Sequence, residues 1–156
     1  IIDVFNEVKK REQSAKLLLL GVGDLQDEIR QKVDSLGISD SVYFLGVKKN
    51  VEDYLSAADC YIMPSLYEGL PVAAVEAECS GLPCVMSTNI TKEVELTENT
   101  KFLSLNETAE FWATEIIKCK QLHREDCSKT VEEKGYDVKD VAVNLQNKYI
   151  ELLNNC

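Results

Sequence analysis

Short apolar runs alternate with helical segments along this chain, and that alternation limits the possible folds more than any other feature. The runs span 17–20, 42–45, 60–63, 83–86 and 102–105, and a small or turn-forming residue follows each of them. Such short runs, rich in strand-forming residues, predict β-strands. Because they are apolar throughout, they are typical of a parallel sheet with helices on both faces. We therefore predict an α/β protein with a doubly wound parallel sheet.

Helical periodicity occupies the intervals between the apolar runs. In the first long interval Leu25 begins an apolar face, with Asp24 as the expected N-cap and Gly37 as the expected stop. Beyond the last run the pattern is helical. There Trp112 is interpreted as a core anchor, and Asp137 is expected to cap a final helix. The apolar stripe of that helix comprises Val141, Leu145, Tyr149 and Leu152.

Composition limits the classes of partner. The chain has 156 residues, enough for one domain, 1–156, with its own core. Its net charge is −10, whereas nucleic acid and anionic lipid select basic surfaces, so we expect neither as a partner. No apolar run approaches the roughly 18 residues that cross a bilayer, so we expect no membrane insertion by this segment.

Six cysteines raise the question of disulfides or a metal site. They occupy positions 60, 79, 84, 119, 127 and 156, without any CxxC spacing, and His123 is the only histidine. Zinc sites usually need closely spaced thiolate and imidazole ligands, so we predict no bound metal. We expect all six thiols to be reduced and the protein to be cytoplasmic.

The segment after the third apolar run points to a ligand. Positions 64–71 read Pro-Ser-Leu-Tyr-Glu-Gly-Leu-Pro, where a strand ends and a helix is expected to begin at Pro71. A helix N-terminus favours a phosphate, and Gly69 has no side chain to hinder a ligand. Glu68 repels phosphate and suits a hydroxyl, while Glu76, about 7.5 Å along the helix, can accept from two vicinal hydroxyls. Hydroxyls at both ends and phosphate between them describe a nucleotide sugar.

Simpler interpretations of these features remain open at this point. Glutamate in the first turns of a helix is favoured by the helix dipole alone, so Glu76 also fits a purely structural role. Gly21 and Gly23 follow the first apolar run, but Gln26 stands where a dinucleotide-binding motif needs its third glycine. A tight turn is therefore the favoured interpretation of that loop.

A longer ordered set of motifs resembles one known family. The motifs are Phe44-Leu45-Gly46, Ala58-Asp59, Pro64-Ser65, Glu68-Gly69-Leu70-Pro71, Glu76-Ala77 and Gly81-Leu82-Pro83. Together they resemble the group 1, or family 4, glycosyltransferases, whose hallmark is a pair of glutamates, here Glu68 and Glu76. The stretch 87–94, Ser-Thr-Asn-Ile-Thr-Lys-Glu-Val, resembles the branch that builds capsular polysaccharide or exopolysaccharide.

The resemblance implies a fold and a reaction. The fold is GT-B, with this chain as its Rossmann-like C-terminal, donor-binding half, extended by extra C-terminal helices. The implied reaction is a metal-independent transfer from a UDP-sugar or GDP-sugar that retains anomeric configuration and uses no cofactor. The acceptor, a glycan or a lipid-linked acceptor, would bind through a separate N-terminal domain, at the inner face of the membrane.

The resemblance also assigns roles to individual residues. Glu68 corresponds to the first glutamate of the family, which contacts the donor sugar, and is the implied catalytic-site residue. Glu76 corresponds to the second glutamate, which binds the ribose hydroxyls. The loop at Gly46 and Val47 would border the base. The implied donor-binding residues are Glu76, Gly69, Leu70, Pro71, Gly46 and Val47.

The sequence departs from the family pattern in two places. Many relatives carry a paired-glycine loop where this chain has Asn89-Ile90-Thr91. The phosphate-binding arginine and lysine of the family, and its acceptor domain, correspond to segments upstream of Ile1. We therefore expect this chain by itself to be catalytically inert, with open strand edges that associate with other chains.

Two other functions remain as alternatives from the sequence. One is a non-catalytic α/β binding or interaction module, and the other is a nucleotide-sugar epimerase-like domain. An epimerase needs further acid–base residues, for which His123 in a helical tail is a poor candidate. Nucleotide-sugar binding that weakens in Glu76→Gln would separate the transferase from the binding module.

Overall fold

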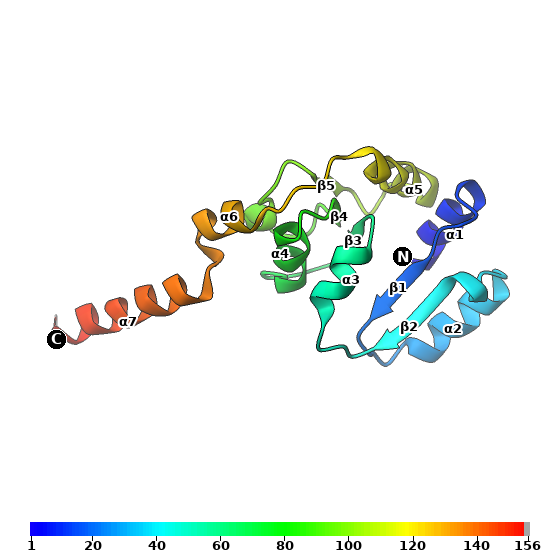
Figure 1. Cartoon of the computed structure of the whole chain (residues 1–156). Coiled ribbons are helices and arrows are strands. Elements are labelled where there is room, and N and C mark those ends of the chain that lie inside the picture. Colours follow the sequence, from blue (N-terminus) through cyan, green and yellow to red (C-terminus); the bar gives the residue numbers. More distant parts are fainter. Residues whose placement is uncertain (155–156) are drawn as a thin grey trace.

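Each predicted apolar run contributes a strand to the computed structural model, which describes residues 1–154 (Figure 1). The strands are β1 (Leu17–Leu20), β2 (Val42–Gly46), β3 (Tyr61–Met63), β4 (Cys84–Ser87) and β5 (Thr100–Leu103). β1 pairs with β2, β3 pairs with β4 and β4 pairs with β5, and each of these ladders is parallel. The predicted α/β class with parallel strands is therefore confirmed.

The last strand lies earlier in the sequence than predicted. It covers Thr100–Leu103 instead of 102–105. Ser104 has already left the ladder, and its carbonyl accepts the indole N–H of Trp112 at 3.0 Å. Trp112 is 3% exposed, which confirms it as a core anchor.

Helices occupy the intervals between the strands. They are α1 (Ile2–Arg11), α2 (Gln26–Ser35), α3 (Val51–Ala57), α4 (Val72–Cys79), α5 (Ala109–Lys118), α6 (Ser128–Val131) and α7 (Val138–Asn154). Short 3-10 turns lie at Ser39–Ser41, Lys92–Val94 and Cys119–Gln121.

Of the predicted boundary residues Asp24, Gly37 and Asp137, the last two are confirmed and the first is wrong. Gly37, with φ +68°, ends α2 in a conformation that favours glycine. Asp137 caps α7, because its Oδ1 accepts a backbone N–H two residues further on at 2.6 Å. Asp24 does not cap α2, which begins later with Leu25 in the N-cap position and no side-chain cap. Leu25 is consequently 59% exposed and does not begin a buried face.

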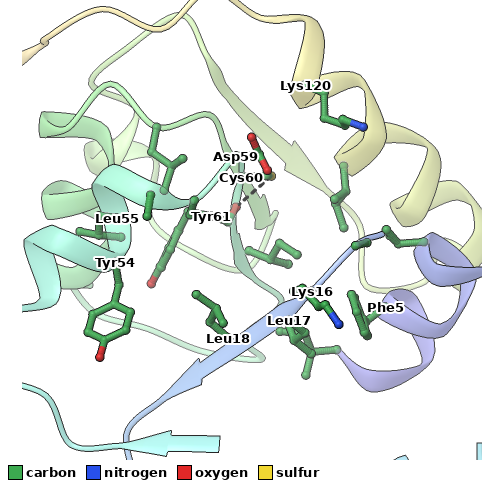
Figure 2. Close-up of a pocket in the computed structure, with 18 of the residues that line it drawn as sticks. Phe5, Lys16, Leu17, Leu18, Tyr54, Leu55, Asp59, Cys60, Tyr61 and Lys120 are labelled. Atoms are coloured by element: carbon green, nitrogen blue, oxygen red, sulfur yellow. Dashed lines mark hydrogen bonds between the residues drawn. The ribbon is translucent and has the colours of Figure 1, made fainter. Parts of the chain in front are cut away.

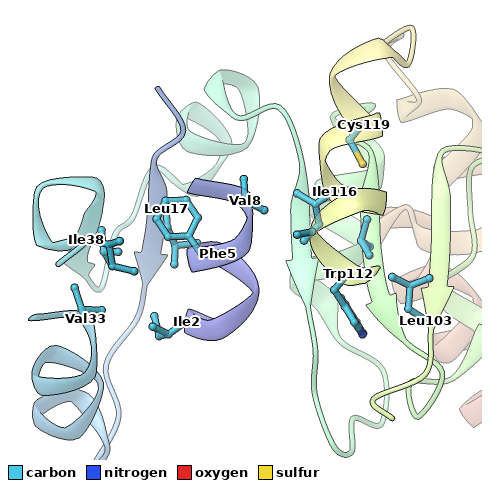
Figure 3. Packing of buried hydrophobic residues seen from close by; sticks show 13 residues of the cluster. Ile2, Phe5, Val8, Leu17, Val33, Ile38, Leu103, Trp112, Ile116 and Cys119 are labelled. Carbon is cyan, nitrogen blue, oxygen red and sulfur yellow. The ribbon is translucent and has the colours of Figure 1, made fainter. Parts of the chain in front are cut away.

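The larger of two apolar clusters contacts all five strands (Figure 3). Ile2, Phe5 and Val8 of α1 are buried together with Leu17 of β1 and with residues of α5. Figure 3 shows α1 between Leu17 on one side and the α5 residue Ile116 on the other. α1 therefore joins the β1–β2 half of the molecule to the β3–β5 half.

Two polar contacts reinforce the packing of α1 on α5 and the turn that follows it. An Arg11 guanidinium N–H donates to Thr114 Oγ1 at 2.7 Å. Lys120 Nζ lies 2.9 Å from Glu12 Oε2. Both contacts are exposed, so each adds little to stability by itself, but they fix which ends of the two helices meet.

The strands form two sheets within this shared core. β1 and β2 make one sheet and β3, β4 and β5 make the other, and no ladder joins β1 to β3 within residues 1–154. Leu17 and Val42 of the first sheet belong to the same buried cluster as Val85 and Leu103 of the second. The edges of β1 and β3 are therefore open, with a cavity of about 600 Å³ between them.

α7 extends away from the rest of the molecule (Figure 1). Every residue of α7 is exposed, including the predicted apolar stripe, whose members are 47–61% exposed. The stripe thus forms on the helix but packs against nothing in the described chain. No helix among residues 1–154 combines the length and the hydropathy needed to span a membrane.

A carboxylate is buried where α4 meets the segment before β5. Glu78 is 0% exposed, and its Oε2 accepts the backbone N–H groups of Leu96 at 2.9 Å and Thr97 at 2.7 Å. Its Oε1 has no hydrogen-bond partner among the described residues. Burial raises the pKa of Glu78 from its ordinary value of 4.5, against the opposing effect of these hydrogen bonds.

We expect Glu78→Gln to be more stable than the wild type at pH 8, and the difference to shrink toward pH 4.5. Because the pKa of Glu78 is higher in the folded protein, this carboxyl ionises first in the unfolded chain as the pH rises above 4.5. The free energy of unfolding of the wild type therefore falls as the pH rises from 4.5 through the folded-state pKa. Glutamine keeps the acceptor without a charge, so the gain should reach about 1–3 kcal/mol. Urea unfolding of both proteins across this range measures it, and parallel pH profiles would contradict the prediction.

Candidate functional site

The loop between β3 and α4 holds Glu68 in a defined position. Glu68 is half-buried, and its Oε1 accepts the Ser65 hydroxyl at 2.9 Å. Its backbone forms an isolated parallel bridge with Ile90, which lies in the loop after β4. The carboxylate is therefore fixed from its own loop and from the neighbouring one, which is the rigidity that a binding group needs.

The loop after β4 supports the loop that carries Glu68. The Ser87 hydroxyl donates to the Ser65 carbonyl at 2.5 Å, and the Asn89 amide donates to the Leu66 carbonyl at 3.1 Å. The departure from the family pattern at positions 89–91 thus has a structural role here. The sequence analysis named Ser65 and Ser87 only as members of family motifs and assigned neither of them a contact. The available signal was a serine or asparagine directly after a strand, where such side chains commonly bond nearby backbone.

Glu76 is exposed on the second turn of α4. Burial raises the pKa of the Tyr61 hydroxyl, and the charges of Glu68 and Glu76 are among the nearby groups that raise it further. Both carboxylates therefore act on one phenol. A pair of carboxylates offers only acceptors, so this arrangement suits a ligand rich in hydroxyls.

The residues between the two glutamates form the predicted turn into α4. Pro71 is buried and takes the N-cap position, so the helix begins at Val72, one residue later than predicted. Its carbonyl accepts the Ala74 N–H at 3.0 Å. Gly69 and Leu70 are exposed, and a Cβ added at Gly69 would meet nothing within 4 Å. The surface beside Gly69 is thus open to a ligand.

Gly46 and Val47 lie on the other sheet, at the end of β2. Gly46 has φ +66°, and its carbonyl accepts the Gly21 N–H at 2.8 Å, which closes the ends of β1 and β2 together. Val47 is 74% exposed. Within the described chain, no hydrogen bond joins this turn to the loop that carries Glu68. The turn at Gly46 and the loop that carries Glu68 thus lie beyond strands of different sheets.

The cavity between β1 and β3 is a separate feature (Figure 2). Leu18, Tyr54 and Tyr61 are among its lining residues, whereas Glu68 and Glu76 are not. Most of its lining is aliphatic or aromatic, and its two carboxylates are Glu12, which pairs with Lys120, and Asp59. We therefore keep the loop between β3 and α4, where Glu68 is held by Ser65, as the candidate site.

The cysteines offer no cluster for a metal. Five of them are free thiols, and within residues 1–154 no three histidine, cysteine or acidic side chains gather as metal ligands. The Sγ atoms of Cys60 and Cys119 are 3.3 Å apart, and this hydrogen bond, together with burial, raises the pKa of Cys60. Cys156 lies outside the described residues. His123 is exposed and lies 3.3 Å from Glu125.

Comparison with known proteins gives a consistent group of relatives. The family model described as "Glycosyl transferases group 1" matches residues 1–121. The glycosyltransferase EpsF of Bacillus subtilis (strain 168) is 37% identical over 147 residues, which are 91% of this chain and 38% of EpsF. The UDP-Gal:alpha-D-GlcNAc-diphosphoundecaprenol alpha-1,3-galactosyltransferase of Escherichia coli is 31% identical over 71 residues, 45% of this chain and 18% of that enzyme. The chain therefore spans less than half the length of these relatives.

Solved structures show the same fold. A sucrose-phosphate synthase from Thermosynechococcus elongatus matches 99% of this chain and 43% of its own, with a TM-score of 0.79 and 19% identity. HepE of Anabaena, solved in complex with UDP, matches 99% of this chain and 44% of its own, with a TM-score of 0.71 and 23% identity. These similarities confirm the predicted Rossmann-like domain of a GT-B fold.

Proposed function

The chain belongs to the group 1 glycosyl transferases, and from this premise we propose that it forms the nucleotide-sugar site of a glycosyltransferase. The observation that carries the proposal is the fixed Glu68 carboxylate, held by Ser65 and by the bridge to Ile90, with Glu76 exposed on the helix that follows the same loop. This pair of acceptors fits a ligand with hydroxyls at both ends, and it favours the transferase over a non-catalytic module.

The proposed roles follow from the position of each group. Glu68 contacts the hydroxyls of the donor sugar, and Glu76 accepts from the two ribose hydroxyls. The backbone at Gly69 and Leu70 lies against the diphosphate, at the N-terminus of α4, where N–H groups and the helix dipole favour anions. Pro71, at the N-cap of that helix, adds no N–H donor. The turn at Gly46 and Val47 borders the base.

We propose a UDP-sugar as the donor and a lipid-linked glycan as the acceptor of the parent enzyme. HepE is described in complex with UDP, and the name of the E. coli relative gives a UDP-sugar donor and a diphosphoundecaprenol-linked acceptor. The resemblance at 87–94 supports a place in surface polysaccharide synthesis, in the cytoplasm at the inner face of the membrane. No metal or cofactor is needed in this proposal.

Titration of the purified chain with nucleotide sugars tests the proposal. Amide shifts are followed by NMR as UDP-glucose, UDP-galactose, GDP-mannose or UDP alone is added. We expect saturable shifts at Glu68–Leu70 and on α4. The dissociation constants should be in roughly the millimolar range, which corresponds to a binding free energy of about −4 kcal/mol. GDP-mannose binding with no response to UDP-sugars would reverse the assignment of the base. If every ligand shifted only amides away from Glu68–Leu70 and α4, the proposal would be wrong.

Glu76→Ala is expected to weaken donor binding by about 1.5–3 kcal/mol, because it removes charge-assisted hydrogen bonds to the ribose. At a millimolar starting affinity, saturable shifts should disappear. Glu52→Ala is the matched control, since Glu52 is also an exposed glutamate in the first turns of a helix, α3. Unchanged binding in Glu76→Ala, or equal loss in both variants, would show that Glu76 does not bind the donor.

A further inference from the structure

Two cysteine side chains that are far apart in the sequence meet inside the protein. Cys60 directly precedes β3, and Cys119 begins the 3-10 turn that follows α5, 59 positions later. Their Sγ atoms are 3.3 Å apart, so the two sulfurs are in direct contact. Because an S–S bond is about 2.05 Å long, only a small approach of the two sulfurs separates this contact from a disulfide.

The surrounding core holds both cysteines in place. Cys119 is buried in the larger apolar cluster together with Trp112 and Ile116, and Figure 3 shows these three residues along α5 and its end. Cys60 is half-buried and packs against the same cluster. Since side chains in a close-packed core have few rotamers available, the contact between the two sulfurs is a fixed feature of the fold.

The hydrogen bonds of the pair make the two thiols chemically different. The Cys60 S–H donates to Cys119 Sγ, and the Cys119 S–H donates to the Glu115 carbonyl at 3.6 Å. The hydrogen bond from Cys60 lowers the pKa of Cys119, against the opposing effect of burial, and the charge of Lys101 acts in the same direction as the hydrogen bond. Since the thiolate is the reactive form of cysteine, Cys119 is the thiol that reacts first with an oxidant.

The other described thiols have different partners. Within residues 1–154 no second hydrogen bond joins two thiols, and the Sγ atoms of Cys84 and Cys127 donate to backbone carbonyls. Cys79 meets Cys127 through the backbone, because the Cys79 carbonyl accepts the Cys127 N–H at 3.3 Å. The contact between sulfurs therefore distinguishes Cys60 and Cys119 from the other cysteines.

We propose that Cys60 and Cys119 form a redox modification site, at which hydrogen peroxide converts the two thiols into a reversible disulfide. Hydrogen peroxide is small and uncharged, which suits a pair inside an apolar cluster. In a reducing compartment such a bond is transient and forms in response to oxidative conditions. Cys60 precedes β3 whereas Glu68 follows it, so this site is separate from the loop at Glu68 and the proposal does not depend on donor binding.

The reaction has two steps. The Cys119 sulfur, after loss of its proton, attacks one oxygen of the peroxide, the O–O bond breaks, and a sulfenic acid and one water are formed. The Cys60 sulfur then attacks the sulfenic sulfur, the S–O bond breaks, and the leaving hydroxide takes the Cys60 proton to give a second water. The two thiols lose two electrons in total, and one peroxide is reduced to two waters. A dithiol reductant reverses the bond and is itself oxidised to a disulfide.

Mass spectrometry of the oxidised chain tests the proposal. The purified chain is treated with a millimolar excess of hydrogen peroxide in native buffer, the remaining thiols are alkylated, and the protein is digested without reduction. The protease Glu-C cleaves after glutamate and places Cys60 on fragment 53–68 and Cys119 on fragment 116–125. We expect these two fragments as the main cross-linked species, which dithiothreitol separates. A main cross-link between other fragments, or sulfinic acid without a cross-link, would overturn the proposal.

The same oxidation in concentrated urea is the control for the native contact. In the unfolded chain the six cysteines pair without the restraint of the core, and short loops such as the one between Cys79 and Cys84 are the easiest to close. We therefore expect a mixture of cross-links in urea. If the Cys60–Cys119 cross-link dominated equally in urea, the contact in the folded protein would not direct the reaction and the proposal would be wrong.

Thermal unfolding measures the effect of the bond on the fold. A disulfide between Cys60 and Cys119 restricts the unfolded chain over a loop of 59 positions, so peroxide should raise Tm by roughly 10 °C. Cys60→Ser should abolish the rise, whereas Cys79→Ser, a matched change of another half-buried cysteine, should keep it. No rise in the cross-linked wild type, or an equal rise in Cys60→Ser, would contradict the proposal. The mapping and the Tm of the wild type decide the question even if a variant fails to fold.

Discussion

Gly81→Ala is expected to lower the free energy of unfolding by about 3–5 kcal/mol, a size that a single substitution reaches only through a specific mechanism. Gly81 follows α4 with φ +69°, where an L-residue is disfavoured by about 1–2 kcal/mol. A Cβ there would also lie 1.7 Å from the carbonyl oxygen of Glu125 and 2.8 Å from its carbonyl carbon. Because both atoms are backbone, the segment around Glu125 must move away from α4.

Gly37→Ala is the matched control for Gly81→Ala. Gly37 ends α2 with φ +68°, so its backbone carries the same conformational cost, but a Cβ there would meet nothing within 4 Å. We expect Gly37→Ala to cost only about 1–2 kcal/mol. Urea unfolding monitored by circular dichroism measures both variants. Equal losses would mean that the contact with Glu125 contributes nothing.

Arg124→Ala is expected to cost about 3 kcal/mol, because hydrogen bonds from a charged group contribute about 1.5–3 kcal/mol each and are not additive. The guanidinium donates to carbonyls at the end of α3, at Leu55 (2.8 Å), Ser56 (3.1 Å) and Ala58 (2.9 Å). It also donates to the Ser80 carbonyl after α4, at 3.1 Å. One cation therefore satisfies the C-terminal carbonyls of two helices, where positive charge is favoured.

Arg124→Lys separates charge from geometry. Lysine keeps the positive charge but lacks the planar fork of donors that reaches both helices, so it should recover only a minor part of the loss. Arg11→Ala is the control, since the one described side-chain hydrogen bond of Arg11, to Thr114, is exposed, and we expect a cost below about 1 kcal/mol. Full recovery by lysine in thermal unfolding would show that only the charge matters.

The two substitutions act on the same segment. Gly81 and Arg124 both hold the segment that follows α5 against the ends of α3 and α4. Once Gly81→Ala displaces that segment, the hydrogen bonds of Arg124 to the ends of α3 and α4 are already weakened, so their removal costs less. We therefore expect the double variant to lose less free energy of unfolding than the sum of the losses in the two single variants.

Sequence reasoning succeeded where the signal is local. Five apolar runs predicted five strands, and Trp112 was correctly placed in the core, because the pattern of each element is set by residues close together in the chain. The errors at element boundaries arose because local turns compete with helix formation there, and hydrophobic periodicity does not report such turns. Leu25 was predicted to begin a buried face, but it lies at the end of a turn and is exposed.

The sequence by itself determined the α/β class and the family, because these depend on short-range pattern and on an ordered set of motifs. The tertiary structure alone decided how distant segments meet. Arg124 bonds carbonyls 44 to 69 positions away, and Asn89 supports a loop 23 positions earlier. The cavity between β1 and β3 likewise depends on how α1 and α5 pack. Contacts between remote segments depend on the path of the whole chain, so they leave no periodic signal in the residues that make them.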